Sequence, residues 1–117
     1  MALQGEHMPD NGQQVARLSE LKQAQPQSVV LPDGVEILLV RVGEQVFAVQ
    51  STCTHQETWL DMGRVIPKSF EIECPLHDGR FDLRNGQPTN PPVTEPLKTY
   101  SVRVDGDTVF VSEDGSA

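Results

Sequence analysis

The chain has 117 residues, which predicts a single domain with one modest core. Apolar residues make up 37% of it and aromatic residues only 5%, so the predicted core is mostly aliphatic. The 17 acidic and 9 basic side chains give a formal net charge of −8, which argues against binding to nucleic-acid backbones or to anionic membrane surfaces. Such acidity favours partners with basic docking patches. The alternative explanation is that the acidity only keeps the protein soluble.

The two ends of the chain are predicted to be polar tails. Residues 1–14 form the first tail, where His7 is expected to be solvated and not a ligand. The domain is predicted over residues 15–112, and residues 113–117 form the second tail. The N-terminal segment lacks the basic and apolar regions of a signal peptide, and no apolar run approaches the roughly 20 residues of a membrane span. We therefore expect a cytoplasmic protein.

The first half of the domain is predicted to consist of short strands. Runs rich in Val, Ile and Leu recur between turn signals, and a single turn follows the first run. Pro32-Asp33-Gly34 and Gly43-Glu44 are typical turn sequences, and the second predicts a hairpin. The strands are predicted at residues 15–18, 27–31, 35–42 and 45–50, with the single turn at residues 19–22.

The second half continues the same pattern. Asn85-Gly86 is a strong hairpin signal. Residues 87–96 contain four prolines and are predicted to be an ordered surface loop, because proline cannot donate to a strand ladder. No helix of normal length is visible, so the pattern predicts an all-β antiparallel sandwich or partly open barrel. The further strands are predicted at residues 70–73, 80–83, 98–104 and 108–111.

Two short motifs contain the only cysteines of the chain and two of its three histidines. They are Cys53-Thr54-His55 and Cys74-Pro75-Leu76-His77. Thiolate and imidazole ligands in equal number suit zinc, or an iron–sulfur cluster with mixed ligation. A disulfide is the weaker explanation, because each cysteine has a histidine two or three residues beyond it.

The order of the ligands separates the two metal hypotheses. Zinc sites with two cysteines and two histidines usually group the ligands by type along the chain, whereas here each motif has one of each. If the motifs form two facing loops, the cysteines meet at one depth and the histidines at another. Two cysteines would then bind one iron and two histidines the other.

The second motif continues as Cys74-Pro75-Leu76-His77-Asp78-Gly79-Arg80-Phe81-Asp82, and together the motifs resemble the Rieske signature. More closely, the chain is similar to the Rieske ferredoxins of bacterial aromatic-ring dioxygenase systems. The likeness covers roughly residues 15–112 and includes Pro91-Pro92-Val93, which matches a proline loop beside the cluster in that family. One departure is Gln56, because the family usually has glycine directly after the first histidine.

The resemblance implies a Rieske fold, in which a cluster-binding subdomain of about residues 51–84 is inserted into a larger β base. It implies one 2Fe–2S cluster bound by Cys53, His55, Cys74 and His77. It further implies an electron carrier and not an enzyme, which accepts electrons from an FAD- and NADH-dependent ferredoxin reductase and passes them to a terminal ring-hydroxylating oxygenase. The alternatives are the Rieske-like small subunit of an assimilatory nitrite reductase and a structural zinc domain. We expect a monomer.

The resemblance also predicts a low reduction potential. High-potential Rieske proteins have Ser and Tyr hydroxyls near the cluster where this chain has Gly79 and Phe81, and their bracing disulfide corresponds here to Thr58 and Leu76. Without those donors the reduced state is less stabilised, so we expect a potential of about −150 mV, the low end of the Rieske range.

The residues around the histidines suggest how the electron moves. His55 and His77 are expected to face solvent or a partner. Gln56, Glu57, Trp59 and Asp78 could form a docking rim around them, while Trp59 and Leu60 could instead pack beneath the first loop. Pro75 and Pro92 are expected to stiffen the loops.

Overall fold

The computed structural model describes residues 13–32, 34–54, 58–75, 79–90 and 95–112. Within them the chain is all-β, with ten strands and three short 3₁₀ turns, so the predicted fold class is confirmed. The strands are β1 (Gln13–Arg17), β2 (Gln27–Val30), β3 (Glu36–Val42), β4 (Gln45–Gln50), β5 (Arg64–Ile66), β6 (Glu71–Glu73), β7 (Arg80–Asp82), β8 (Pro88–Asn90), β9 (Thr99–Asp105) and β10 (Thr108–Ser112). The 3₁₀ turns are η3 (Leu18–Glu20), η4 (Leu60–Met62) and η5 (Pro67–Ser69).

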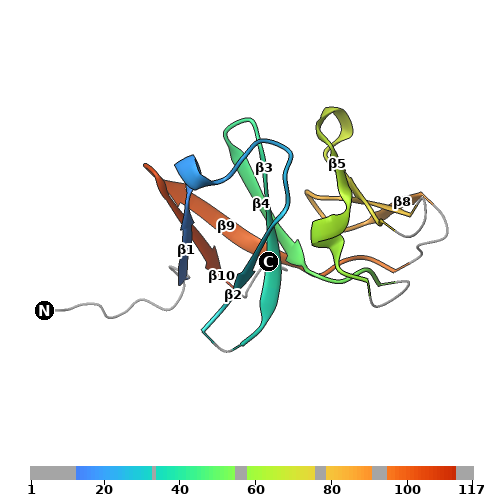
Figure 1. Cartoon of the computed structure of the whole chain (residues 1–117), viewed down its shortest axis with the longest axis horizontal. Coiled ribbons are helices and arrows are strands. Elements are labelled where there is room, and N and C mark those ends of the chain that lie inside the picture. The colour runs from blue at the N-terminus through green and yellow to red at the C-terminus, as the bar shows by residue number, and fades with distance from the viewer. Residues whose placement is uncertain (1–12, 33, 55–57, 76–78, 91–94, 113–117) are drawn as a thin grey trace, which may run out of the picture.

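The strands form two sheets that lie side by side along the long axis of the molecule (Figure 1). The larger sheet has the order β1-β10-β9-β4-β3-β2 and is nearly closed into a barrel. The smaller sheet has the order β5-β6-β7-β8. The second cysteine motif begins directly after β6, so the smaller sheet is the part of the molecule that presents it.

Strand β3 separates two buried clusters, and this explains why it reads as a continuous apolar run. Ile37 and Leu39 pack into the interior of the barrel, together with Val109 and others. Leu38 and Val40 point the other way, into a cluster that joins the barrel to the smaller sheet. Successive side chains of a strand point to opposite faces, so a strand with a core on each side must be apolar at every position.

Most of the predicted strands are confirmed within one or two residues. Strand β4 has the predicted bounds, and β1 begins at Gln13, two residues earlier than expected, because Gln13 pairs with Val111. The hairpin predicted at Asn85-Gly86 is confirmed, since Asp82 donates its N–H to the carbonyl of Gln87 at 2.8 Å. Strand β5 was not predicted, because Arg64-Val65-Ile66 lacks the apolar–acidic alternation that marks the equally short β6.

The prediction that residues 87–96 are a surface loop is wrong for its first part. Residues 88–90 form β8, which pairs antiparallel with β7. Strand β8 lies at the edge of the smaller sheet, and Pro88 is its first residue. Proline is tolerated at the first residue of a strand and on an edge strand, because an edge strand leaves half of its N–H groups outside the ladder.

No helix in the described part of the chain is long and apolar enough to cross a membrane.

Candidate metal centre

The two cysteines occupy equivalent positions in two arms of the chain. The N–H of Cys53 donates to the carbonyl of Thr58 at 2.9 Å, and the N–H of Cys74 donates to the carbonyl of Gly79 at 2.8 Å. Each cysteine is therefore the first residue of a loop that closes five residues later. We call residues 51–60 the first arm and residues 71–82 the second arm.

The residue pair below each loop is also equivalent in the two arms. Thr52 bridges Trp59 in the first arm, and Glu73 pairs with Arg80 in the second. Both arms are thus antiparallel hairpins with the cysteine at the same place. In the first arm the side chains alternate: Ser51, Cys53 and Leu60 are buried, while Trp59 is exposed. This two-residue period directs the cysteine toward the interior.

Both cysteines are in one buried cluster. Cys53 is 4% exposed and Cys74 is 2% exposed, and both pack with Leu60, Ile72 and Phe81. Neither is in a disulfide. The fold therefore brings the two thiols of the sequence motifs into the same apolar region.

The two histidines of the motifs lie outside the described residues, as do several neighbours that the sequence analysis singled out. In sequence, each histidine is within one of the two loops, two residues after Cys53 and three residues after Cys74. Among the described residues, no group of three or more His, Cys, Asp or Glu side chains forms a possible metal site. Of the residues that the sequence analysis named, those outside the described ranges are His7, Asp33, His55, Gln56, Glu57, Leu76, His77, Asp78, Pro91, Pro92 and Val93.

A glycine holds the two arms at a close distance. A Cβ atom built on Gly63 would lie 2.2 Å from the carbonyl oxygen of Glu73 and 3.0 Å from that of Leu60. Glu73 directly precedes Cys74, and Gly63 follows the η4 turn that leaves the first arm. Only a residue without a side chain permits this approach. The sequence analysis missed Gly63, because a single glycine between two motifs gives no sign of what its backbone contacts.

A third segment of the chain also braces the first arm. The Thr54 hydroxyl, between the two candidate ligands of the first motif, donates to the carbonyl of Glu95 at 2.7 Å. Two residues further on, the N–H of Leu97 donates to the carbonyl of Gly86 at 2.8 Å. Residues 95–97 therefore connect the first arm to the turn that follows the second.

Charged side chains surround the base of the second arm. The Glu73 carboxylate accepts from Arg80 Nε at 3.1 Å and from Arg64 Nε at 3.2 Å, so three neighbouring strands are linked across one face of the small sheet. The hydrogen bond from Arg80, followed by that from Arg64, lowers the pKa of Glu73 below its usual range. The hydrogen bond from Arg84 lowers the pKa of Asp82 in the same way.

Trp59 and Leu60 were both candidates for packing beneath the first loop, and the structure separates them. Leu60 is fully buried and packs beneath the arm, as one interpretation held. Trp59 is 52% exposed and does not pack there. The donor-poor surroundings expected from the sequence are consistent with the fold, because Phe81 is fully buried in the cluster that contains both cysteines.

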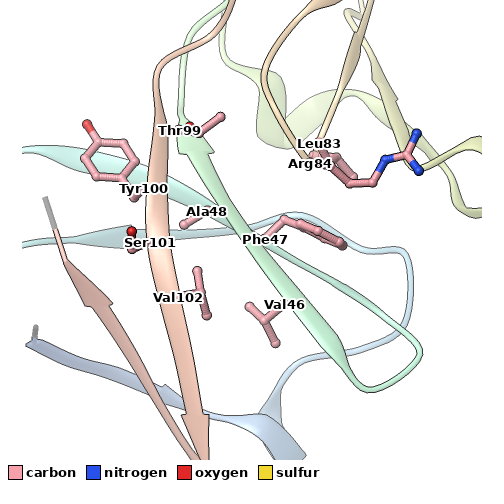
Figure 2. Close-up of a pocket in the computed structure, with 9 residues that line it drawn as sticks. All are labelled: Val46, Phe47, Ala48, Leu83, Arg84, Thr99, Tyr100, Ser101 and Val102. Atoms are coloured by element: carbon pink, nitrogen blue, oxygen red, sulfur yellow. The ribbon is translucent and has the colours of Figure 1, made fainter. Parts of the chain in front are cut away.

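A separate cleft of about 270 Å³ lies at the junction of the two sheets (Figure 2). It opens where β4 and β9 diverge beyond their two paired positions, Ala48 with Tyr100 and Val49 with Thr99. Phe47 points toward Leu83 and Arg84 at one side of it. The lining residues include no Cys, His, Asp or Glu, so this cleft has none of the chemistry of a metal centre.

The described residues fit a 2Fe–2S cluster. Two thiols at equivalent positions of two hairpins, in one apolar cluster, provide soft ligands for a single iron from two sides. The same two loops contain one histidine each, which is the complement required by the second iron of a Rieske cluster.

Comparisons with known proteins agree with this geometry. The Rieske [2Fe-2S] domain family matches residues 11–101. The ferredoxin component of a naphthalene 1,2-dioxygenase system from Pseudomonas aeruginosa is 38% identical over 82 residues, which are 70% of this chain and 77% of the relative.

Solved structures extend the likeness to the fold. The ferredoxin of carbazole 1,9a-dioxygenase from Nocardioides aromaticivorans IC177 is 46% identical, with a TM-score of 0.79 over 85% of this chain and 94% of that one. A complex of reduced oxygenase and oxidised ferredoxin in carbazole 1,9a-dioxygenase contains a chain that is 31% identical, with a TM-score of 0.78 over 85% of this chain and 99% of that chain.

A small subunit assigned to an NADPH nitrite reductase has a TM-score of 0.74 over 84% of this chain and 94% of that one. It is only 24% identical, so the likeness shows a shared fold alone. The match to the family over most of the domain, together with the paired cysteine arms, sets the zinc hypothesis aside, and the chain belongs to the Rieske 2Fe–2S family.

Proposed function

We propose that this protein carries single electrons from a flavoprotein reductase to a terminal ring-hydroxylating oxygenase. The observation on which the proposal depends is the pair of equivalent hairpins that place Cys53 and Cys74 in one buried cluster. Relatives with this domain are ferredoxin components of dioxygenase systems, and a solved complex pairs a ferredoxin with its oxygenase. These relatives transfer electrons and are not the catalytic subunits of their systems.

The ligand set that we propose is Cys53 and Cys74 on one iron and His55 and His77 on the other. When bound, the 2Fe–2S cluster supplies one-electron redox chemistry. The hairpins keep both thiols in fixed positions, and the surrounding apolar side chains exclude water from that side of the site. A fixed and partly dry site needs little rearrangement when its charge changes.

The proposed ligands make the oxidised site neutral overall, because two thiolates offset the two positive charges of the oxidised core. A neutral site accepts an electron against less negative charge than a site with four thiolates. The potential should therefore be above that of plant-type ferredoxins. Because Gly79 and Phe81 have no side-chain donor, we expect a value of about −150 mV, at the low end of the Rieske range.

The electron donor is an FAD- and NADH-dependent ferredoxin reductase, and the protein acts as a monomer, because a shuttle gains nothing from association. Both cysteines are outside any disulfide, which suits a reducing compartment such as the cytoplasm. The nitrite reductase small subunit stays the weaker alternative, because its identity is 24% against 46% for a dioxygenase ferredoxin.

Spectroscopy and metal analysis test the cofactor. We expect about two irons and two sulfides per chain, a visible spectrum that bleaches with dithionite, and a rhombic EPR signal of low average g in the reduced state. A colourless protein with zinc after anaerobic preparation would contradict the proposal.

Electron transfer tests the function itself. The reduced protein should reoxidise when it is mixed anaerobically with a terminal Rieske oxygenase in the absence of oxygen. The matched control is the same protein with Cys53→Ser, which should transfer nothing. A protein that instead co-purifies in a permanent complex with a nitrite reductase large subunit would favour the alternative.

A further inference from the structure

We propose that Trp59 and Met62 form an apolar docking platform for the terminal oxygenase, which would present an apolar depression bordered by basic side chains. We call these two residues the platform. The inference rests on the proposed function, since it names the surface through which the same electron carrier recognises its acceptor.

The position of the platform follows from the fold of the first arm. Trp59 is opposite Thr52 in the hairpin, on the side away from the buried Cys53 and Leu60. The chain then enters the η4 turn, in which the N–H of Met62 donates to the carbonyl of Trp59 at 3.4 Å. Trp59 is the extended N-cap of this turn, so the hydrogen bond holds the two residues at either end of one short turn. Both apolar side chains are exposed there.

The exposure of the platform is not explained by folding. Trp59 is 52% exposed and Met62 is 75% exposed, although each could contribute more to stability in the interior. Trp59 directly follows Thr58, whose carbonyl closes the first loop on Cys53, and Met62 is three residues further along the chain. Exposed aromatic and methionine side chains are enriched in protein interfaces. The platform therefore follows directly after the first loop, which contains His55 in sequence.

The charges around the platform define the chemistry of the partner. Residues 51–63 include two acidic side chains and no Lys or Arg. Asp61 is exposed between the two platform residues in sequence, and the exposed Glu95 is linked to the first arm through Thr54. Arg64, the next cation along the chain, is paired with Glu73. A complementary surface therefore needs an apolar depression with Lys or Arg at its border.

The same charges argue against a second copy of this chain as the occupant. A symmetric dimer through the platform would place two acidic segments against each other, in chains that each have a formal net charge of −8. A transient redox partner fits better, because a platform of two residues suits a small interface that must also release.

The experiment compares the double variant Trp59→Thr/Met62→Gln with the matched control Val30→Thr. Val30 is also an exposed apolar residue, at 65%, but it is on β2 at the edge of the larger sheet. Each stoichiometrically reduced ferredoxin is mixed anaerobically with a series of oxygenase concentrations. The probes are the terminal oxygenases of carbazole 1,9a-dioxygenase from Nocardioides aromaticivorans IC177 and Novosphingobium sp. KA1, and that of the Pseudomonas putida naphthalene system.

We expect the wild type to reduce at least one probe. With that probe, the double variant should need about ten times more oxygenase for half-maximal rate, because loss of an aromatic anchor typically costs tenfold or more in affinity. The rate at saturation, the EPR spectrum and the reduction potential should match the wild type. Val30→Thr should match it in every measurement.

The outcomes separate this inference from the proposed function. If the wild type reduces a probe and the double variant reduces it equally well, the platform is wrong and the electron-carrier function stands. If the wild type reduces none of the three, both are wrong. Two further results would overturn the platform as an oxygenase surface: an effect confined to reduction by a flavoprotein reductase, or a wild-type dimer that the double variant converts to a monomer.

Discussion

The two arms that present the cysteines close with the same hydrogen bond but are supported in different ways. The second arm is part of a regular four-stranded sheet, and the β6–β7 ladder fixes its register. In the described residues of the first arm, one isolated bridge joins Thr52 and Trp59, next to the hydrogen bond from the Leu60 N–H to the Ser51 carbonyl at 2.8 Å. The first arm also depends on contacts from elsewhere, namely Gly63 and Glu95. Equivalent loops can thus be built on unequal supports. The first arm should be more sensitive to single contacts, and the second more tolerant.

The largest effect is expected from the cysteines themselves, and here the two arms should behave alike. Cys53→Ser and Cys74→Ser should each abolish cluster binding, because both thiols are proposed ligands of one iron and neither has a substitute in the chain. The measurement is iron and sulfide content with the visible spectrum. Thr52→Val, beside the first cysteine, should keep full iron content. A cysteine variant that retains the wild-type spectrum would remove that residue from the ligand set.

The next largest effect is expected at Gly63, in the support of the first arm. Gly63→Ala should destabilise the protein by about 3 kcal/mol, because the new Cβ would overlap the Glu73 carbonyl and both backbones must shift. Thermal unfolding of the loaded protein measures it.

Gly106→Ala is the control for the glycine prediction. Gly106 has a positive φ of 62° but nothing within 4 Å of an added Cβ, so only backbone strain of about 1 kcal/mol applies. Equal losses in the two variants would mean that the approach of Gly63 to the second arm is not needed.

A smaller effect is expected at the turn that ends the second arm. The Asp82 carboxylate accepts from Arg84 Nη2 at 2.8 Å and from Arg84 N–H at 2.8 Å. Asp82→Asn should cost about 1 kcal/mol at neutral pH. The exposed Asp105→Asn, whose side chain is 3.5 Å from Arg103, should change stability by less than about 0.5 kcal/mol.

The Asp82 prediction also has a pH dependence of defined sign. Because the pKa of Asp82 is lowered in the folded state, chiefly by the hydrogen bond from Arg84, its contribution is fully present above the unfolded pKa of about 3.9. It is lost as the pH falls through the lower pKa of the folded protein. Unfolding measured between pH 7 and pH 3 should therefore show the wild type and Asp82→Asn converging at the acidic end. A constant difference would contradict this sign.

The smallest effect is expected at Thr54, the brace of the first arm. Thr54→Val removes the hydroxyl that donates to Glu95 and should cost roughly 0.5 to 1 kcal/mol. The control Thr52→Val changes a neighbouring position of the same type and should stay within about 0.5 kcal/mol of the wild type. If both variants melt alike, the brace does not distinguish the two arms.

The regular elements were predictable because their signals are local. Strand β4 and the Asn85-Gly86 hairpin follow from alternation and turn chemistry over a few residues. Strands β5 and β8 were not predictable, because Arg64-Val65-Ile66 lacks the apolar–acidic alternation of the equally short β6, and β8 begins at a proline in a proline-rich segment. Trp59 shows the same limit, since its exposure depends on which way the first arm faces.

The sequence by itself determined the chemistry of this protein. Two cysteine–histidine motifs of matching pattern define a set of possible ligands, and the Val-, Ile- and Leu-rich runs between turn signals define an all-β chain. Only the tertiary structure decided how the two arms are held: by the approach of Gly63 to Glu73, by the Thr54 brace and by the burial of both cysteines in one cluster. The reason is physical, because residue type and local pattern encode bonding capacity, whereas contacts between distant segments depend on how the whole chain packs.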